Sequence, residues 1–167
     1  NFKIDMPIVD SLRIYVNTEQ VDEYGKPKER QVKSVIEYLK GELLIDNPGN
    51  KSGIKRIAKY PVFNSLKESY VYYQKGSIQK GVYKRDNFYF QLTPFSFDSI
   101  DNFDNAQLQF QGSFTSAGIF PQFDEVLSLQ PDFSLGFQRK TPGEGFKVYG
   151  DKGTFTNTIM LSNQGLR

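Results

Sequence analysis

Residues 107–115 read Gln107-Leu108-Gln109-Phe110-Gln111-Gly112-Ser113-Phe114-Thr115, and this stretch decides the fold class. Its even-numbered positions carry Leu, Phe, Gly and Phe, whereas its odd-numbered positions carry Gln, Ser and Thr. A period of two residues is that of an extended strand, because successive side chains point to opposite faces. The stretch therefore predicts an antiparallel strand with one face on a hydrophobic core and the other exposed.

Shorter segments of the same kind lie on both sides of this strand, separated by turn residues. We predict strands over residues 12–16, 43–45, 70–73, 76–84, 87–92, 126–130 and 133–138, and a hairpin that joins 145–149 to 154–161. Gly150-Asp151-Lys152-Gly153 is a favourable turn for that hairpin. Turns about 8–12 residues apart are typical of all-β proteins. The sequence thus predicts a mainly β fold, an antiparallel sheet or sandwich-like arrangement.

One segment has a helical period instead. Apolar residues recur at i, i+3, i+4 and i+7 at Val32, Val35, Ile36 and Leu39. This spacing places them on one stripe of an amphipathic helix. Pro27 suits the first turn of a helix and Gly41 suits its C-terminal end. We therefore predict one amphipathic helix near residues 28–40.

The composition excludes several chemistries. The 167-residue chain contains no Cys, His or Trp. Thiolate nucleophiles, disulfides, Cys-ligated metal sites and imidazole-based catalysis are therefore excluded. No apolar run approaches the roughly 18 residues of a membrane-spanning helix. The length is sufficient for one hydrophobic core, so we predict a single β-rich domain over residues 1–167, with residue 85 as the point at which it would subdivide.

Charge is distributed in blocks, although the total is only +2. Residues 24–85 have a net charge of +9 and contain seven of the ten Tyr residues, whereas residues 86–137 contain no Lys or Arg, seven acidic residues and eleven of the fifteen Phe residues. Two interpretations are open: the blocks pack against each other, or the acidic block faces a cation or a basic partner. The small net charge gives no general reason to expect nucleic acid.

The first candidate site is a group of tyrosines, Tyr70, Tyr72 and Tyr73. Alternation places Tyr70 and Tyr72 on one face of a strand and Tyr73 on the other, so at least one face presents tyrosine to solvent or to a partner. Exposed tyrosine can stack on sugars, which makes carbohydrate a candidate ligand; the alternative is that tyrosine serves here as an ordinary strand residue. Nucleic acid is disfavoured because the neighbouring acidic segments would repel phosphate.

The second candidate site is a calcium site at Asp98, Asp101 and Asp104, within Asp98-Ser99-Ile100-Asp101-Asn102-Phe103-Asp104-Asn105. Carboxylate and amide oxygens are the ligands that Ca²⁺ prefers. The spacing is not that of an EF-hand loop, and Asp and Asn are also common turn residues. The alternative is a turn-rich loop that requires no cofactor.

A third candidate site is a pair of catalytic carboxylates, drawn from Asp98, Asp124, Glu125, Asp132 and Glu144. Glycoside hydrolases use two carboxylates about 5–10 Å apart, one of them with a raised pKa. Asp124 and Glu125 are adjacent in sequence and would point to opposite faces of a strand. A hydrolase that uses carboxylates alone is therefore one alternative function, and we assign no catalytic residue.

Four stretches resemble segments of large uncharacterised exported proteins of Bacteroidetes-type bacteria. They are Asn47 to Gly53 (NPGNKSG), Ser69 to Tyr73 (SYVYY), Phe114 to Pro121 (FTSAGIFP) and Asp132 to Phe137 (DFSLGF). The resemblance implies a β-rich module of a cell-envelope or extracellular protein and transfers no site residue.

The ends of the sequence lead to a related expectation. The chain begins Asn1-Phe2-Lys3, without an initiator Met, and it ends soon after a strand-like segment. We therefore expect a piece of a longer protein. The leading hypothesis is a non-enzymatic structural or partner-docking module, whose partners are neighbouring domains of the same chain or another protein. A carbohydrate-binding module and a carboxylate-only hydrolase are the alternatives.

Overall fold

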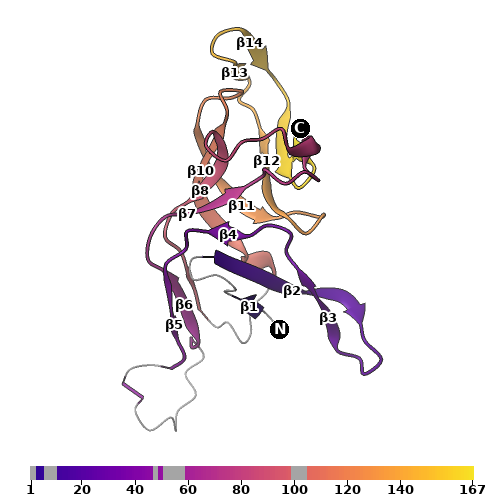
Figure 1. Ribbon diagram of the computed structural model, residues 1–167, viewed down its shortest axis with the longest axis vertical. Helices are drawn as coiled ribbons and strands as arrows, with labels where there is room; N and C mark the ends of the chain where they lie inside the picture. Colours follow the sequence, from indigo (N-terminus) through magenta and orange to yellow (C-terminus); the bar gives the residue numbers. More distant parts are fainter. Residues whose placement is uncertain (1–2, 6–10, 47–48, 51–58, 99–104) are drawn as a thin grey trace.

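The computed structural model describes residues 3–5, 11–46, 49–50, 59–98 and 105–167, and it is mainly β, as predicted (Figure 1). The largest sheet has eleven strands. They are β1 (Lys3–Asp5), β2 (Ser11–Val21), β3 (Pro27–Gln31), β4 (Ile36–Glu37), β7 (Ser69–Tyr72), β8 (Phe88–Leu92), β10 (Gln109–Ser116), β11 (Phe123–Leu129), β12 (Leu135–Lys140), β15 (Thr158–Ser162) and β16 (Gly165–Leu166).

Strands of the large sheet follow one another nearly in chain order. The path is β1-β2-β4-β7-β8-β10-β11-β12-β15-β16, and β3 pairs with β2 beside it. Every pairing along this path is antiparallel. The segment whose alternation is clearest, 107–115, forms most of β10, in the middle of the path. It pairs with β8 on one side and β11 on the other.

Two smaller sheets and two short 3₁₀ helices complete the described part of the fold. One small sheet contains β5 (Gly41–Leu44), β6 (Val62–Ser65) and β9 (Ser96–Phe97), and the other contains β13 (Phe146–Val148) and β14 (Gly153–Phe155). The 3₁₀ helices are η1 (Gln79–Gly81) and η3 (Asn105–Gln107). Figure 1 shows the β13–β14 hairpin at one end of the long axis and the β5–β6 ribbon toward the other. No helix among the described residues combines the length and apolar character that crossing a bilayer would demand.

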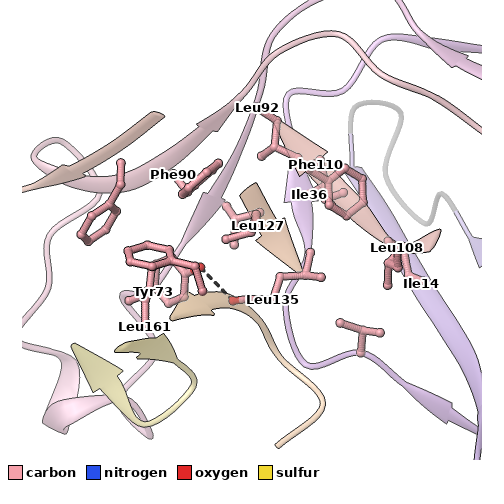
Figure 2. Close-up of a cluster of buried hydrophobic side chains, with 14 of the residues drawn as sticks. Ile14, Ile36, Tyr73, Phe90, Leu92, Leu108, Phe110, Leu127, Leu135 and Leu161 are labelled. Carbon is pink, nitrogen blue, oxygen red and sulfur yellow. Dashed lines mark hydrogen bonds between the residues drawn. The ribbon is translucent and has the colours of Figure 1, made fainter. Parts of the chain in front are cut away.

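The core lies on the inner face of the curled large sheet (Figure 2). Its fully buried aromatic side chains are Tyr73, Phe88, Phe90, Phe110, Phe114 and Phe137. In β10 the predicted apolar face supplies Phe110 and Phe114, whereas Gln109 and Gln111 are exposed. The core takes side chains from both sides of residue 85, since β7 pairs directly with β8 across that point.

Long-range hydrogen bonds connect segments from the first half of the chain to segments from the second half, across the inside of the curled sheet. The Tyr73 hydroxyl donates to the carbonyl oxygen of Leu135 at 2.9 Å, and the Leu135 N–H donates to Ser34 Oγ at 2.9 Å (Figure 2 draws the first). The Lys33 N–H donates to the carbonyl oxygen of Phe133 at 2.7 Å. These bonds satisfy polar groups that the surrounding core removes from water.

The helix predicted near residues 28–40 is wrong, because the segment instead forms β3, an extended connection and β4. The Val32 N–H donates to the carbonyl oxygen of Ile14, continuing the ladder with β2. Val32, Ser34 and Ile36 are buried at a spacing of two. Tyr38 then has a φ of 60°, which interrupts the alternation and returns Leu39 to the core. Positions 32, 36 and 39 therefore satisfy a helical spacing without forming a helix.

Two strand predictions also differ from the structure. The predicted strand over 76–84 is a series of turns around η1 rather than a strand. The predicted segment 154–161 is divided between β14, which pairs with β13 as the hairpin partner, and β15, which pairs with β12. The division allows the second half, with Ile159 and Leu161, to join the main core.

Candidate binding surface

The outer face of the large sheet carries a cluster that we call the tyrosine surface, defined as Tyr38, Tyr70, Tyr72, Arg85 and Tyr89. Tyr70 and Tyr72 alternate with the buried Val71 along β7, so both project outward. Tyr89 on β8 lies directly opposite Tyr72. Tyr38 immediately follows β4, the neighbour of β7, and its side chain is 44% exposed.

The four rings pack against one another. Tyr70 and Tyr72 are nearly parallel, with an interplanar angle of 14° and ring centres 6.0 Å apart. Tyr38 meets both of these rings edge-on at 6.0 and 6.3 Å, and Tyr89 meets them at 5.7 and 6.3 Å. Edge-to-face contacts are a preferred geometry of aromatic pairs, each worth about 0.5–1.5 kcal/mol beyond the area that it buries. The cluster is therefore ordered before any partner arrives.

Arg85 covers one of these rings. Its Cζ atom lies 3.9 Å from the Tyr72 ring centre and 5.8 Å from that of Tyr38. The guanidinium donates to both carboxylate oxygens of Glu37 at 3.1–3.3 Å and to the Tyr38 hydroxyl oxygen at 3.3 Å. The hydrogen bond with Glu37 raises the pKa of Arg85 above its ordinary value. Bidentate pairing and ring stacking together fix the orientation of the guanidinium.

The pKa of Tyr72 is raised above its ordinary value, chiefly because partial burial removes water from the phenolate form. The positive charge of Arg85 acts in the opposite direction. The Tyr72 hydroxyl is therefore protonated at neutral pH and available as a hydrogen-bond donor.

Tyr73, the third tyrosine predicted as a ligand-binding residue, lies on the opposite face of the strand. It is only 1% exposed, and its hydroxyl group donates to Leu135 (Figure 2). Burial raises its pKa well above the ordinary value. Tyr73 therefore belongs to the core, and we do not include it in the binding surface.

The structure does not assemble the predicted calcium site from described residues. Asp98 is exposed after β9, while Asp101 and Asp104 lie outside the described residues. Within the ranges that the structure describes, no group of three or more acidic side chains is placed to hold a metal ion.

The carboxylates considered for catalysis have different surroundings. Glu125 pairs with Arg139 at 3.3 Å. Asp132 accepts hydrogen bonds from Ser134 and from the Asn163 N–H, which ties the β11–β12 turn to the β15–β16 turn. Glu144 is exposed near β13. These contacts give Glu125 and Asp132 structural roles, and neither provides an arrangement of paired catalytic acids.

Next to the tyrosine surface is a shallow cavity of about 320 Å³, which we call the polar hollow. It is lined by Glu68, Gln91, Thr93, Gln111, Gly112, Ser113 and Asp124. The strand register places Gln91, Ser113 and Asp124 in one row across β8, β10 and β11, with Tyr70 next to Gln91 in the same row.

A larger groove of about 760 Å³ separates the end of the β2–β3 hairpin from the β11–β12 turn. Arg30 and Phe133 both line this groove, and the Cζ atom of Arg30 lies 4.3 Å from the Phe133 ring centre. The exposed strand beside it, β3, consists of Pro27, Lys28, Glu29, Arg30 and Gln31. Proline and charged residues of this kind protect edge strands from pairing with other chains, so we do not assign strand addition to this groove.

Sequence reasoning identified Tyr70 and Tyr72 but missed Tyr38, Arg85 and Tyr89. Tyr38 lies within the predicted helix, and Arg85 lies between the predicted strands 76–84 and 87–92. Tyr89 could have been found, because it lies outward in the predicted strand 87–92, between two phenylalanines.

No family model matches this chain, and the searches of curated proteins and of solved structures also find no match. The function must therefore be argued from the chain's own geometry.

Proposed function

We propose that this chain is a non-enzymatic β-rich docking module, whose tyrosine surface binds a protein partner. The observation that carries the proposal is the packed group of four tyrosines and one arginine on the outer face of the large sheet. The partner is a neighbouring domain of the same chain or another protein.

The residue types favour a protein partner. Tyr and Arg are enriched among the residues that contribute most to protein–protein binding energy. Here they are already held in place by ring packing and by Glu37, so little side-chain entropy is lost on association. The cluster offers hydroxyl groups and ring edges in a small area, which suits a partner with both apolar and polar groups.

Carbohydrate binding at these same tyrosines is less well supported. Stacking on a sugar requires an accessible ring face. Arg85 occupies one face of Tyr72, and the neighbouring rings pack against Tyr70. We therefore assign the tyrosine surface to protein and treat saccharide binding as a separate question.

The setting that we propose is a larger cell-envelope or secreted protein. This part of the proposal depends on the resemblance of the four stretches, from NPGNKSG to DFSLGF, to exported bacterial proteins. A module built from antiparallel strands with no cysteine requires no disulfide to fold in such a compartment.

Site-specific photo-crosslinking tests the docking proposal. A photoreactive phenylalanine derivative at position 38 should capture one discrete protein in the native host, whereas the same group at position 24 should not. Tyr24 is 80% exposed in the turn between β2 and β3, away from the cluster. The captured protein, once purified, should bind the wild-type chain at least about tenfold more tightly than Tyr72→Ala, and as tightly as it binds Tyr24→Ala.

Two results would contradict the docking proposal. One is equal crosslinking from positions 38 and 24. The other is a captured protein whose affinity is unchanged by both Tyr72→Ala and Arg85→Ala.

A further inference from the structure

We propose that the polar hollow is a second binding site, which accepts a neutral saccharide. This inference concerns residues outside the tyrosine surface and does not depend on the docking proposal. It begins from the chemistry of the lining. The seven lining residues provide two carboxylates, two carboxamides, two hydroxyl groups and one glycine.

These groups match the hydroxyl groups of a sugar. Carboxylates accept strong hydrogen bonds from O–H donors, and each carboxamide can accept and donate at once. Such a lining can pair with both the hydrogen and the oxygen of a sugar hydroxyl group. A site of this kind selects ligands that satisfy its polar groups, since a ligand without hydroxyl groups would leave them unpaired.

Two hydroxyl groups in the hollow are already oriented. Thr93 Oγ1 donates to the backbone carbonyl oxygen of Gln111 at 3.1 Å. The hydroxyl hydrogen is used in this bond, and the lone pairs of the Thr93 oxygen point away from Gln111. Ser113 Oγ accepts from Gln122 Nε2 at 3.1 Å, so its own hydrogen points away from Gln122. The first group is thus prepared to accept a hydrogen bond and the second to donate one.

Charge selects against anionic ligands. None of the seven lining residues is cationic, and Glu68 and Asp124 are acidic. Uronic acids, sulfated sugars and phosphates would meet like charges without a compensating Lys or Arg. A divalent cation is also disfavoured, because two carboxylates fall short of the six to eight oxygens of a typical calcium site.

The lining also disfavours a peptide. Peptide recognition uses pockets for apolar side chains or a free strand edge. The seven lining residues include no large apolar side chain, and β8 and β10, which supply most of the lining, are each paired on both sides here. The hollow is open and shallow, and its 320 Å³ is near the lower limit of about 300 Å³ for small-molecule sites. A short segment of a neutral glycan lying across the strands fits these limits.

The chain contains a matched pair of residues for the test. Gln109 and Gln111 lie two residues apart on the same exposed face of β10, but only Gln111 lines the hollow. Both can be changed to Ala without removing a buried contact. Gln91→Ala supplies a second change within the hollow.

The experiment is an NMR titration of the isotopically labelled chain with cellohexaose, mannohexaose and chitohexaose, with hexagalacturonate as the anionic comparison. We expect at least one neutral hexasaccharide to shift amide signals of β8, β10 and β11. Gln111→Ala and Gln91→Ala should each weaken that binding about fivefold or more, as expected for a lost hydrogen bond, while Gln109→Ala leaves it unchanged.

The proposal is overturned if no neutral hexasaccharide shifts these signals at millimolar concentration, if Gln109→Ala weakens binding as much as Gln111→Ala, or if hexagalacturonate binds best. Cleavage of a neutral hexasaccharide would also overturn it, because it would make the site catalytic. Circular dichroism of each variant verifies folding. Tyr72→Ala should retain saccharide binding, so failure of the docking proposal and failure of this one are distinguishable.

Discussion

The hydroxyl group of Tyr73 reaches across the core to the backbone of Leu135, 62 residues further along the chain, and donates a 2.9 Å hydrogen bond to its carbonyl oxygen. This bond links β12 to the end of β7, which are separated by three intervening strands in the sheet order. Tyr73, which the sequence predicted as a ligand-binding residue, therefore connects the two sides of the curled sheet.

Replacing Tyr73 with Phe should destabilise the fold. The substitution retains the ring and removes the buried hydroxyl, which leaves the Leu135 carbonyl without this donor. We expect the free energy of unfolding to fall by about 1–2 kcal/mol. Urea denaturation followed by circular dichroism measures the change. Tyr70→Phe is the control on the outer face and should change stability by less than about 0.5 kcal/mol; equal losses in the two variants would contradict the assigned role.

Alkaline pH should destabilise the protein through the same residue. Burial raises the pKa of Tyr73 above its ordinary value near 10, so the unfolded chain releases this proton at a lower pH than the folded chain. The stabilisation is complete below pH 10 and is lost as the pH rises above it, by up to about 1.4 kcal/mol per pH unit. Denaturation curves between pH 8 and 11 should converge for wild type and Tyr73→Phe. A constant difference across that range would contradict the prediction.

Removing the charge of Arg85 should raise the pKa of Tyr72 further. Arg85 lowers that pKa by its positive charge, while burial raises it. In Arg85→Gln only the raising effects remain. An NMR titration of the tyrosine Cζ signals measures the pKa directly. Lys84→Gln is the control, since it removes a neighbouring exposed charge that does not contribute to the Tyr72 shift. An unchanged or lower Tyr72 pKa in Arg85→Gln would contradict the geometry.

Gly112 should tolerate no side chain. A Cβ atom at this position would lie 2.0 Å from the backbone oxygen of Gln91 and 2.7 Å from the Phe90 ring. We expect Gly112→Ala to lower stability by about 1–3 kcal/mol, the usual range for overpacking. Gly143→Ala is the control, because a Cβ atom there meets nothing within 4 Å. Thermal denaturation compares the two, and a similar midpoint for both would show that β8 and β10 are further apart than described.

The strands were predictable where one face is buried. In β10 the alternation of Phe110 and Phe114 with polar residues marks the inner face directly, because burial on one side of a sheet imposes a period of two. The same reasoning located the first half of β2 and most of β7 and β8, and it separated Tyr72 from Tyr73. Local pattern was therefore sufficient for the fold class.

The false helix shows what local pattern cannot decide. The apolar positions 32, 36 and 39 fit the helical spacing, yet the segment is extended. Tertiary contacts decide this, because the Ser34 hydroxyl accepts from the Leu135 N–H, 101 residues away. The membership of the tyrosine surface could not be predicted from local pattern either. Tyr38 and Arg85 reach it from a segment after β4 and from a loop before β8, and only the order β4-β7-β8 in the sheet brings them together. No spacing in the sequence encodes that order.

The nearly sequential order of the strands also determines how the chain should fold in time. Neighbouring strands such as β10 and β11 are separated by short turns, so their pairing closes small loops at little entropic cost. The contact between Ser34 and Leu135 closes a loop of about a hundred residues and gains nothing until the intervening strands exist. We expect this closure after the main barrier to folding, so that Ser34→Ala accelerates unfolding and leaves the refolding rate nearly unchanged.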